Sequence, residues 1–292
     1  MEQFGLLVLN GLSWGMTVFL AAAGLTLIFG ILHILNFAHG GFVMLGAYLA
    51  YSLMSQFEAS SLWTLAGAML ASSIALGLIG AIVDATIFAK LREVSESYSL
   101  IATYALLLLT QGLVKAIWGI NILSVSAPPE LRGASEIFAT FTPRYVMFIV
   151  GCGVTIFLLL EVVVHRTALG KTIQSVAVDQ WMAGLLGINV RLILLGTVTA
   201  GVALAGFAGA VLALNQSLSP DMGSALIIQA FGVIVIGGMG SIRGAFISAL
   251  AMGIIVAIGD KYLPDLPGVF FYVALILILT LRPHGLGRAV HK

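Results

Sequence analysis

Long apolar runs separated by short polar segments dominate this chain. Runs of roughly 18–25 residues recur along the whole length, which is the length that an α-helix needs to cross a hydrocarbon core of ~30 Å. Alternating segments of about ten residues are absent, which argues against a transmembrane β-barrel. We therefore predict an all-α, polytopic transmembrane helical bundle of about nine membrane segments, within a range of eight to ten. The predicted segments are 6–31, 37–54, 62–88, 98–118, 145–164, 192–214, 224–240, 244–259 and 268–281.

The composition supports a membrane protein. Hydrophobic residues make up 60% of the 292 residues and charged residues only 9%, whereas soluble domains carry about 25% charged residues. Cys152 is the only cysteine, which excludes a disulfide framework and a cysteine metal site. No basic residue precedes the first run, so we expect a retained helix rather than a cleaved signal. We expect one transmembrane domain over residues 1–292 with no metal site.

The basic residues predict an orientation. If the loop 89–97 is cytoplasmic, the basic residues inside are Lys90, Arg92, Arg166, Lys171, Arg191, Arg243, Arg282, Arg288 and Lys292. Those outside are Lys115, Arg132, Arg144 and Lys261. This imbalance follows the positive-inside rule. It predicts an N-terminus outside and a C-terminus in the cytoplasm.

Residues 165–191 form a compact amphipathic loop between two apolar runs, with basic residues at both ends. We predict a short helix from about Lys171 to Leu186, with Gly184 and Gly187 allowing it to end or to pack closely. Its apolar residues Ile173, Val176, Met182 and Leu186 would lie broadly towards one side. An interfacial helix resting on lipid is the alternative, but the loop lacks the Lys/Arg-rich polar face of such helices. Docking of a cytoplasmic protein is therefore favoured.

Gly170-Lys171-Thr172 is similar to the end of a phosphate-binding loop. That motif requires a glycine five residues before Gly170, where this chain has His165. We therefore expect no ATP binding by this chain.

Two glycine-interrupted segments form a weak internal repeat. Phe29-Gly30-Ile31 precedes Asn36-Phe37-Ala38-His39-Gly40-Gly41, and Phe231-Gly232-Val233 precedes Gly237-Gly238-Met239-Gly240-Ser241. Paired interruptions of this kind indicate discontinuous helices beside a transport pathway. The segments 224–240 and 244–259 are short, and either could be partial or re-entrant.

Asn36, His39 and Gly40 are candidate pathway residues, because polar side chains beside an apolar run usually face a cavity or the bundle interior. The structural alternative is that Asn36 caps a helix starting near Phe37, with His39 in its first turn. Both roles can hold together.

Gly237, Gly238 and Gly240 are the second set of candidate pathway residues. Glycines here could open the helix so that backbone groups face a ligand. A tight cytoplasmic turn with Arg243 as its basic flank is the alternative.

Asp84, Lys115 and Glu161 are isolated charges near the ends of predicted segments. Each could reach the interface by snorkelling, so anchoring is favoured over ion coupling. The predicted segments contain no central set of acids, which argues against a proton- or sodium-driven carrier. No nucleophile–base set stands out, which argues against an intramembrane hydrolase, and we expect no enzymatic activity.

Four motifs in order resemble the permease subunits of branched-chain amino acid ABC importers, over essentially the full chain and closer to the shorter permease type. The first is Leu25-Thr26-Leu27-Ile28-Phe29-Gly30 followed by Asn36-Phe37-Ala38-His39-Gly40. The second is Gly170-Lys171-Thr172 with Ala177, Asp179, Ala183 and Leu185-Leu186-Gly187-Ile188-Asn189. The third is Gly237-Gly238-Met239-Gly240-Ser241 with Gly244-Ala245, and the fourth is Arg282-Pro283-His284-Gly285-Leu286.

This resemblance implies a subunit of a bacterial-type inner membrane importer. Its partners would be a second related permease, two cytoplasmic ATPases that bind ATP and Mg²⁺, and an extracytoplasmic solute-binding protein. The loop 165–191 would be the coupling element on an ATPase, through Gly170, Lys171, Asp179, Ala183, Gly184 and Gly187. This chain itself would hold no cofactor.

The resemblance leaves the solute open. The acidic pair typical of the family's loop is Asp179-Gln180 here, and Gly41 stands where the family often has an acidic residue. Besides branched-chain or other hydrophobic amino acids, urea, amides and aromatic or other organic acids are alternatives within the same architecture. An ion-coupled secondary carrier, a passive channel for a small neutral solute and a structural subunit without a pathway are alternatives of other classes.

Overall fold

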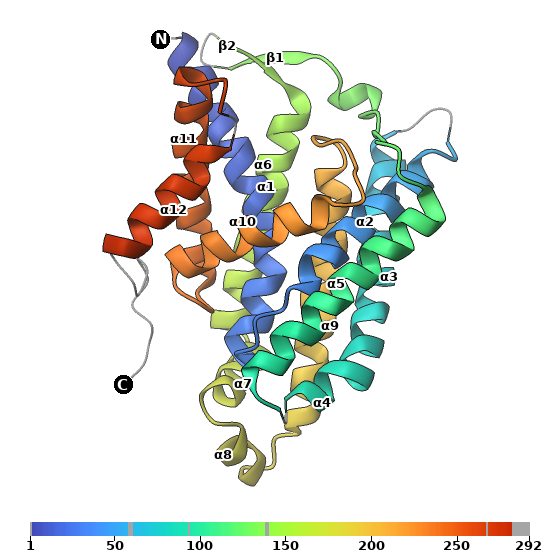
Figure 1. Ribbon diagram of the computed structural model, residues 1–292, viewed down its shortest axis with the longest axis vertical. Coiled ribbons are helices and arrows are strands. Elements are labelled where there is room, and N and C mark those ends of the chain that lie inside the picture. Colours follow the sequence, from blue (N-terminus) through green and yellow to red (C-terminus); the bar gives the residue numbers. More distant parts are fainter. Residues whose placement is uncertain (1, 58–60, 93, 138–139, 267, 282–292) are drawn as a thin grey trace.

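The computed structural model describes residues 2–57, 61–92, 94–137, 140–266 and 268–281. Helices form over all the predicted apolar segments, as Figure 1 shows: α1 (Glu2–Leu32), α2 (Ala38–Met54), α3 (Leu62–Val83), α5 (Glu96–Trp118), α6 (Arg144–Arg166), α9 (Val190–Leu212), α10 (Met222–Gly237), α11 (Ile242–Tyr262) and α12 (Val269–Leu281). The other elements are the π-helix η1 (Asp84–Phe88), α4 (Ala89–Leu91), the 3₁₀-helix η2 (Pro129–Leu131), β1 (Ala134–Ile137), β2 (Thr140–Pro143), α7 (Ala168–Val178) and α8 (Gln180–Leu185).

The described helices confirm an all-α polytopic membrane protein. Six are long and apolar enough to cross a membrane, among them α11 with 21 residues. The segment 244–259 therefore belongs to a helix of spanning length. By contrast, α10 has 16 residues and would measure about 24 Å, less than the ~30 Å hydrocarbon core. Figure 1 shows α10 lying across the long axis of the bundle.

α1 is the central helix, and it packs against α6, α9, α10 and α11. Glycines on both sides let the backbones approach closely, as is common where helices associate in lipid. A Cβ on Gly15 would lie only 2.6 Å from the Ala249 carbonyl oxygen, and one on Gly24 only 2.2 Å from that of Gly201. The first helix is therefore fixed in register against α9 and α11.

The chain turns sharply after α1. His33 has a φ of 53°, the left-handed conformation that often follows a helix end. Helix α2 begins five residues later, at Ala38, so the predicted boundary between the first two segments is correct within a few residues.

Contrary to our expectation, Asp84 does not extend to the surface of the bundle. It is only 2% exposed and forms an ion pair with Arg92, across the single π-helical turn η1. Burial lowers the pKa of the Arg92 guanidinium, and the Asp84 carboxylate opposes this shift. The charge is thus compensated by a partner rather than by water, as buried charges require.

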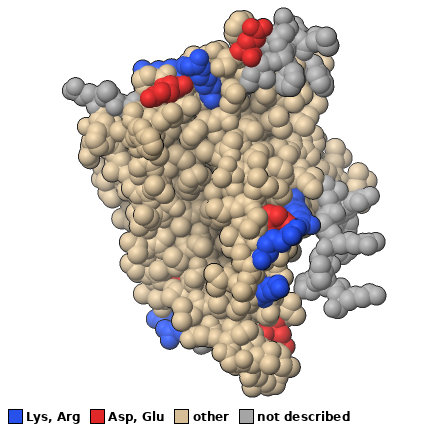
Figure 2. All heavy atoms as spheres, turned by 180° about the vertical axis from the view of Figure 1, so that it is seen from behind, with Lys and Arg blue, Asp and Glu red and all other residues tan. Residues whose placement is uncertain are grey.

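Charged side chains gather towards the ends of the molecule. Figure 2 shows one group at the top of this face and one in its lower half, separated by a wide band of uncharged side chains. At the end opposite α7 and α8, Lys115 pairs with Asp221 at 3.0 Å. The hairpin β1–β2, which the sequence pattern did not predict, covers the same end. Arg282, Arg288, Lys292 and the fourth family motif lie outside the described residues.

Candidate coupling and pathway site

The segment between α6 and α9 folds into two short helices, not the single helix that we predicted over Lys171–Leu186. Asp179 interrupts the helix with an extended backbone, at φ −153° and ψ 102°. Its carboxylate accepts a hydrogen bond from the Met182 backbone N–H at 2.9 Å and thereby caps α8. Aspartate is among the preferred N-cap residues, so the break follows from its side-chain chemistry.

Gly170 lets α7 pack closely against the end of α6. A Cβ at this position would lie 2.1 Å from the Val164 carbonyl oxygen and 2.3 Å from that of Val163. Thr167 caps α7 by accepting from the Gly170 N–H at 3.1 Å and donates its hydroxyl to Val163 O at 2.6 Å. The Gln174 side chain also donates to Val164 O at 2.8 Å. Two side chains and one glycine contact therefore join α7 to α6.

α8 lies at the tip of this segment, beyond the ends of the neighbouring long helices (Figure 1). Its surroundings expose large apolar side chains: Val178 is 87% exposed, Trp181 71% and Leu186 75%. Contiguous exposed apolar residues are typical of an interaction surface. Trp181 was not among our candidates, although the sequence places this large aromatic residue directly after Asp179-Gln180, in the middle of the loop 165–191.

The predicted coupling residues divide into inner and outer positions. Ala183 is buried at 2% exposure and Gly170 is buried, whereas Lys171 and Gly184 are exposed. Gly187 has a φ of 84° and ends the turn after α8, a conformation that glycine adopts most readily.

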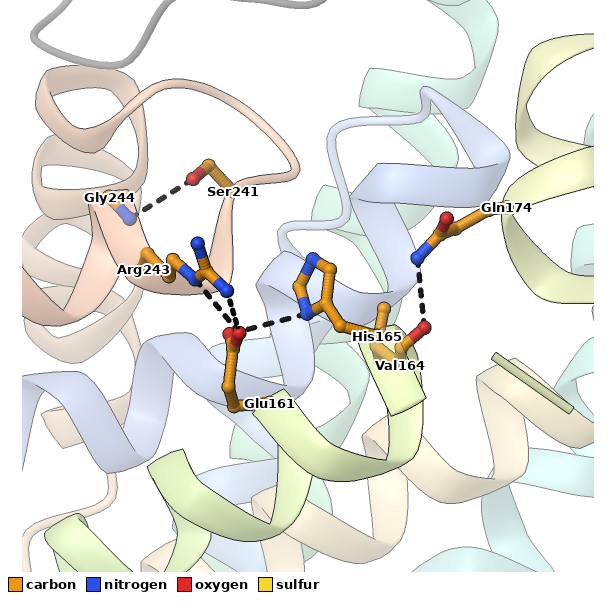
Figure 3. A network of polar contacts seen from close by, with 7 residues as sticks. All are labelled: Glu161, Val164, His165, Gln174, Ser241, Arg243 and Gly244. Carbon is orange, nitrogen blue, oxygen red and sulfur yellow. Dashed lines mark hydrogen bonds and ion pairs between the residues drawn. The ribbon is translucent and has the colours of Figure 1, made fainter. Parts of the chain in front are cut away.

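Glu161 joins α6 to the start of α11 (Figure 3). Its carboxylate accepts from Arg243 Nε at 2.8 Å and from Arg243 Nη2. His165 Nδ1 lies 3.2 Å from the other carboxylate oxygen and would form an ion pair when protonated. The sequence placed Glu161 near the correct end but gave no sign of its partner, which lies far away in the chain.

The segment Gly237–Gly244 is a tight turn between α10 and α11. Gly238 and Gly240 both have positive φ, at 93° and 85°. A Cβ on Gly244 would lie 1.8 Å from the Gly237 carbonyl oxygen, so the two helix ends touch through their backbones. The Ser241 hydroxyl accepts from the Gly244 N–H at 3.0 Å and caps α11. The motif therefore has the geometry of a tight turn, with Arg243 as its flank.

The glycines of the two repeated segments meet in space. A Cβ on Gly240 would lie 3.1 Å from Gly30 Cα. Beside this contact is a cavity of about 80 Å³, lined among others by Gly30, Gly240, Ile173 and Gln174. Helix α7, the central helix α1 and the glycine turn thus share one small space.

His39 lies deeper in the bundle than this cavity. It is 1% exposed, and its Nε2 lies 3.0 Å from the Ala21 carbonyl oxygen of α1. The carbonyl can only accept, so Nε2 carries the proton. Gly40, in the same turn, allows α2 to touch α10, because a Cβ there would lie 2.2 Å from Gly223 O.

Asn36 does not cap α2, contrary to one of our two interpretations. The helix begins at Ala38 and has no side-chain cap. The Asn36 side chain is 2% exposed, and neither of its amide atoms has a hydrogen-bond partner among the described residues. A buried, unpaired amide costs about 1–3 kcal/mol, so it calls for an explanation beyond folding.

The fold and the site together define a polytopic helical membrane protein with a protruding helical segment at one end. Within the described residues there is no cluster of three or more His, Cys, Asp or Glu side chains that could hold a metal ion.

Comparison with known proteins places this chain more narrowly. The family model described as "Branched-chain amino acid transport system / permease component" matches residues 7–279. The LivH permease of Salmonella typhimurium is 30% identical over 96% of this chain and 94% of its own length. The BraD permease of Pseudomonas aeruginosa is 31% identical, covering 96% and 95%. A probable LivH permease of Methanocaldococcus jannaschii is 28% identical, covering 91% and 87%.

Among solved structures, PsaBC from Streptococcus pneumoniae in complex with Fab matches with a TM-score of 0.49 and 14% identity, over 93% of this chain and 89% of that chain. The family model and the similar permeases of Salmonella typhimurium and Pseudomonas aeruginosa show that this chain belongs to the family of branched-chain amino acid transport permeases.

Proposed function

We propose that this protein is the membrane-embedded permease subunit of an ATP-driven importer for branched-chain or other hydrophobic amino acids, and that it is not itself an enzyme. The names of its relatives support this solute class. Its proposed partners are a second related permease, two cytoplasmic ATPases that bind ATP and Mg²⁺, and an extracytoplasmic solute-binding protein. In this proposal α7 and α8 lie in the cytoplasm, with the N-terminus outside.

The exposed apolar tip around α8 is the observation that carries the ATPase contact. Trp181 and Leu186 are 71% and 75% exposed. An interfacial helix would bury such side chains in the membrane, but α8 lies beyond the ends of the long helices (Figure 1). A protein surface that excludes water from these side chains is the better partner, because aromatic anchors dominate such interfaces.

Movement of α7 would reach the interior through two contacts in series. Gln174 and Gly170 connect α7 to the last turn of α6. Glu161, one turn earlier on α6, holds Arg243 at the start of α11 (Figure 3). A displacement at the tip would therefore move the glycine turn against α1, beside the small cavity that leaves room for motion.

The docking surface is tested by reconstituting the importer with its ATPases and solute-binding protein. Trp181→Asp should abolish co-purification of the ATPases and ATP-dependent uptake of labelled leucine. Ile122→Asp is the matched control, since Ile122 is 72% exposed at the opposite end and its change should leave recruitment intact. Normal recruitment by Trp181→Asp would refute the docking proposal. Uptake of urea instead of leucine would refute the solute class alone.

The route through Glu161 has its own test. Glu161→Gln and Arg243→Gln should each lower uptake more than ATPase recruitment, because only the transmission is lost. The exchanged pair Glu161→Arg with Arg243→Glu should recover part of the uptake, since the attraction is restored with reversed signs. If the exchanged pair is no better than the single variants, this ion pair does not transmit the motion.

A further inference from the structure

A second, larger pocket lies at the end of the bundle opposite α7 and α8. It has a volume of about 520 Å³ and lies between α1, α6 and α11. Its walls are apolar, with Leu7, Val146 and Val256 among them. Ligand pockets commonly measure about 300–1,000 Å³ and combine apolar walls with a few polar groups. Neither the coupling segment nor the candidate pathway residues line it.

The polar groups of this pocket come from several parts of the chain. Asn10 and Ser13 lie one turn apart on α1, Asn215 follows α9, and Asp260 and Lys261 lie at the end of α11. Ser13 is 5% exposed. Their convergence provides hydrogen-bonding groups next to one carboxylate and one ammonium.

Asp260 and Lys261 are the charged residues of the lining. The Asp260 Oδ1 atom accepts from the Gly268 N–H at 3.3 Å, and the Lys261 Nζ atom lies 5.9 Å from the centre of the Tyr262 ring. Within the described part of the chain neither side chain forms an ion pair. Adjacent charges of opposite sign suit a ligand that itself carries an ammonium and an anionic group.

Trp14 and Tyr145 also line the pocket. Both types are enriched at the boundary between membrane and water, where one end of the side chain is apolar and the other polar. Leu6, another lining residue, is 39% exposed at the rim. The pocket therefore combines apolar walls, two aromatic side chains and a pair of adjacent opposite charges.

We propose that this pocket binds a phospholipid with a zwitterionic headgroup that contains a primary ammonium, such as phosphatidylethanolamine. The Asp260 carboxylate receives the ammonium and the Lys261 ammonium receives the phosphate, while Asn10, Ser13 and Asn215 offer hydrogen bonds to the ester oxygens. The acyl chains follow the apolar walls towards the membrane. The proposal does not depend on the transported solute.

Lipid retention tests this site directly. The full-length permease is reconstituted in bilayers with equal amounts of phosphatidylethanolamine and phosphatidylglycerol that have identical acyl chains, and the retained lipids are measured by native mass spectrometry. Phosphatidylethanolamine should be retained in excess. Asp260→Asn, which keeps an acceptor for the Gly268 N–H, should reduce that excess by about fivefold, a typical upper effect for one accessible ion pair.

Asp221→Asn is the matched control, because Asp221 lies at the same end and pairs with Lys115 away from the pocket. It should leave the lipid ratio unchanged. Asn10→Leu is a second pocket variant that keeps every charge, and it should weaken retention of both lipids. Equal retention of the two lipids by the unmodified protein, or an unchanged ratio in Asp260→Asn, would overturn the proposal. Displacement of the lipid by free leucine would also overturn it, since the pocket would then take a solute.

Discussion

Replacing Gly170 with alanine should detach α7 from α6 without unfolding the bundle. The added Cβ would lie 2.1 Å from the Val164 carbonyl oxygen and 2.3 Å from that of Val163, whereas ordinary Cβ contacts stay above 3.0 Å. Both carbonyls belong to the last turn of α6 and cannot rotate away without breaking that turn. The start of α7 must therefore shift by roughly 1 Å, as over-packed sites usually do.

The size of the effect follows from two contributions. Over-packing of this kind costs about 1–3 kcal/mol. The shift also lengthens the hydrogen bond from Gln174 to Val164 O, now 2.8 Å, and a typical hydrogen bond contributes about 1 kcal/mol. A combined loss of about 2–4 kcal/mol would raise the population of detached α7 by about 30-fold or more.

Limited proteolysis by trypsin at Lys171 measures that population, because cleavage follows the open fraction when opening is fast. Gly170→Ala should be cleaved about 30-fold faster than the unmodified protein. Gly184→Ala is the matched control in the same segment, since its Cβ would meet nothing closer than Val190 Cγ2 at 4.0 Å. In the reconstituted importer, Gly170→Ala should also consume more ATP for each amino acid transported. Equal cleavage rates for the two variants would refute the packing argument.

Three further predictions concern the interior. Asp84→Asn leaves the half-buried Arg92 charge without its partner and should lower the free energy of unfolding by about 2–4 kcal/mol, less than for a fully buried pair, whereas Asp84→Leu combined with Arg92→Met should recover most of it, as thermal unfolding can show. Asn36→Leu removes a buried, unpaired amide, so it should leave the melting temperature unchanged or higher while uptake falls; unimpaired uptake would exclude a pathway role. Gly40→Ala places a Cβ 2.2 Å from Gly223 O and should lower the melting temperature by several degrees, for a cost of about 1–3 kcal/mol.

Much of the architecture is readable from the sequence because lipid imposes one simple condition on it. A spanning segment must satisfy its backbone internally and present apolar side chains, so each predicted run coincides with a helix. The caps of α7 and α8 are local as well. Asp179 breaks the predicted helix for a reason that involves only its neighbours, and a closer reading of cap residues would have located the break.

The pairings between distant segments could not be predicted in the same way. The contact of Glu161 with Arg243 depends on how α6 and α11 are aligned along α1, and that register is set by close glycine contacts such as Gly15 with Ala249. Hydropathy carries no information about register, because lipid-facing and buried positions are both apolar. The burial of Asp84 was missed because hydropathy does not show which face of a helix is packed, although its partner Arg92 lies only eight residues further along the chain.

The central position of α1 has a consequence for how the protein is made. Its close neighbours α9 and α11 are encoded far downstream: Gly11 packs against Gly253, and Gly24 against Gly201. During synthesis α1 must therefore remain surrounded by lipid until its partner helices have been made. Residues 5–32 are stable in lipid because they contain no Asp, Glu, Lys or Arg. Lipid is exchanged for protein contacts only late, when the C-terminal half arrives. Mutations in α9 or α11 that slow insertion should thus expose the first helix to membrane proteases, although the fault lies elsewhere in the chain.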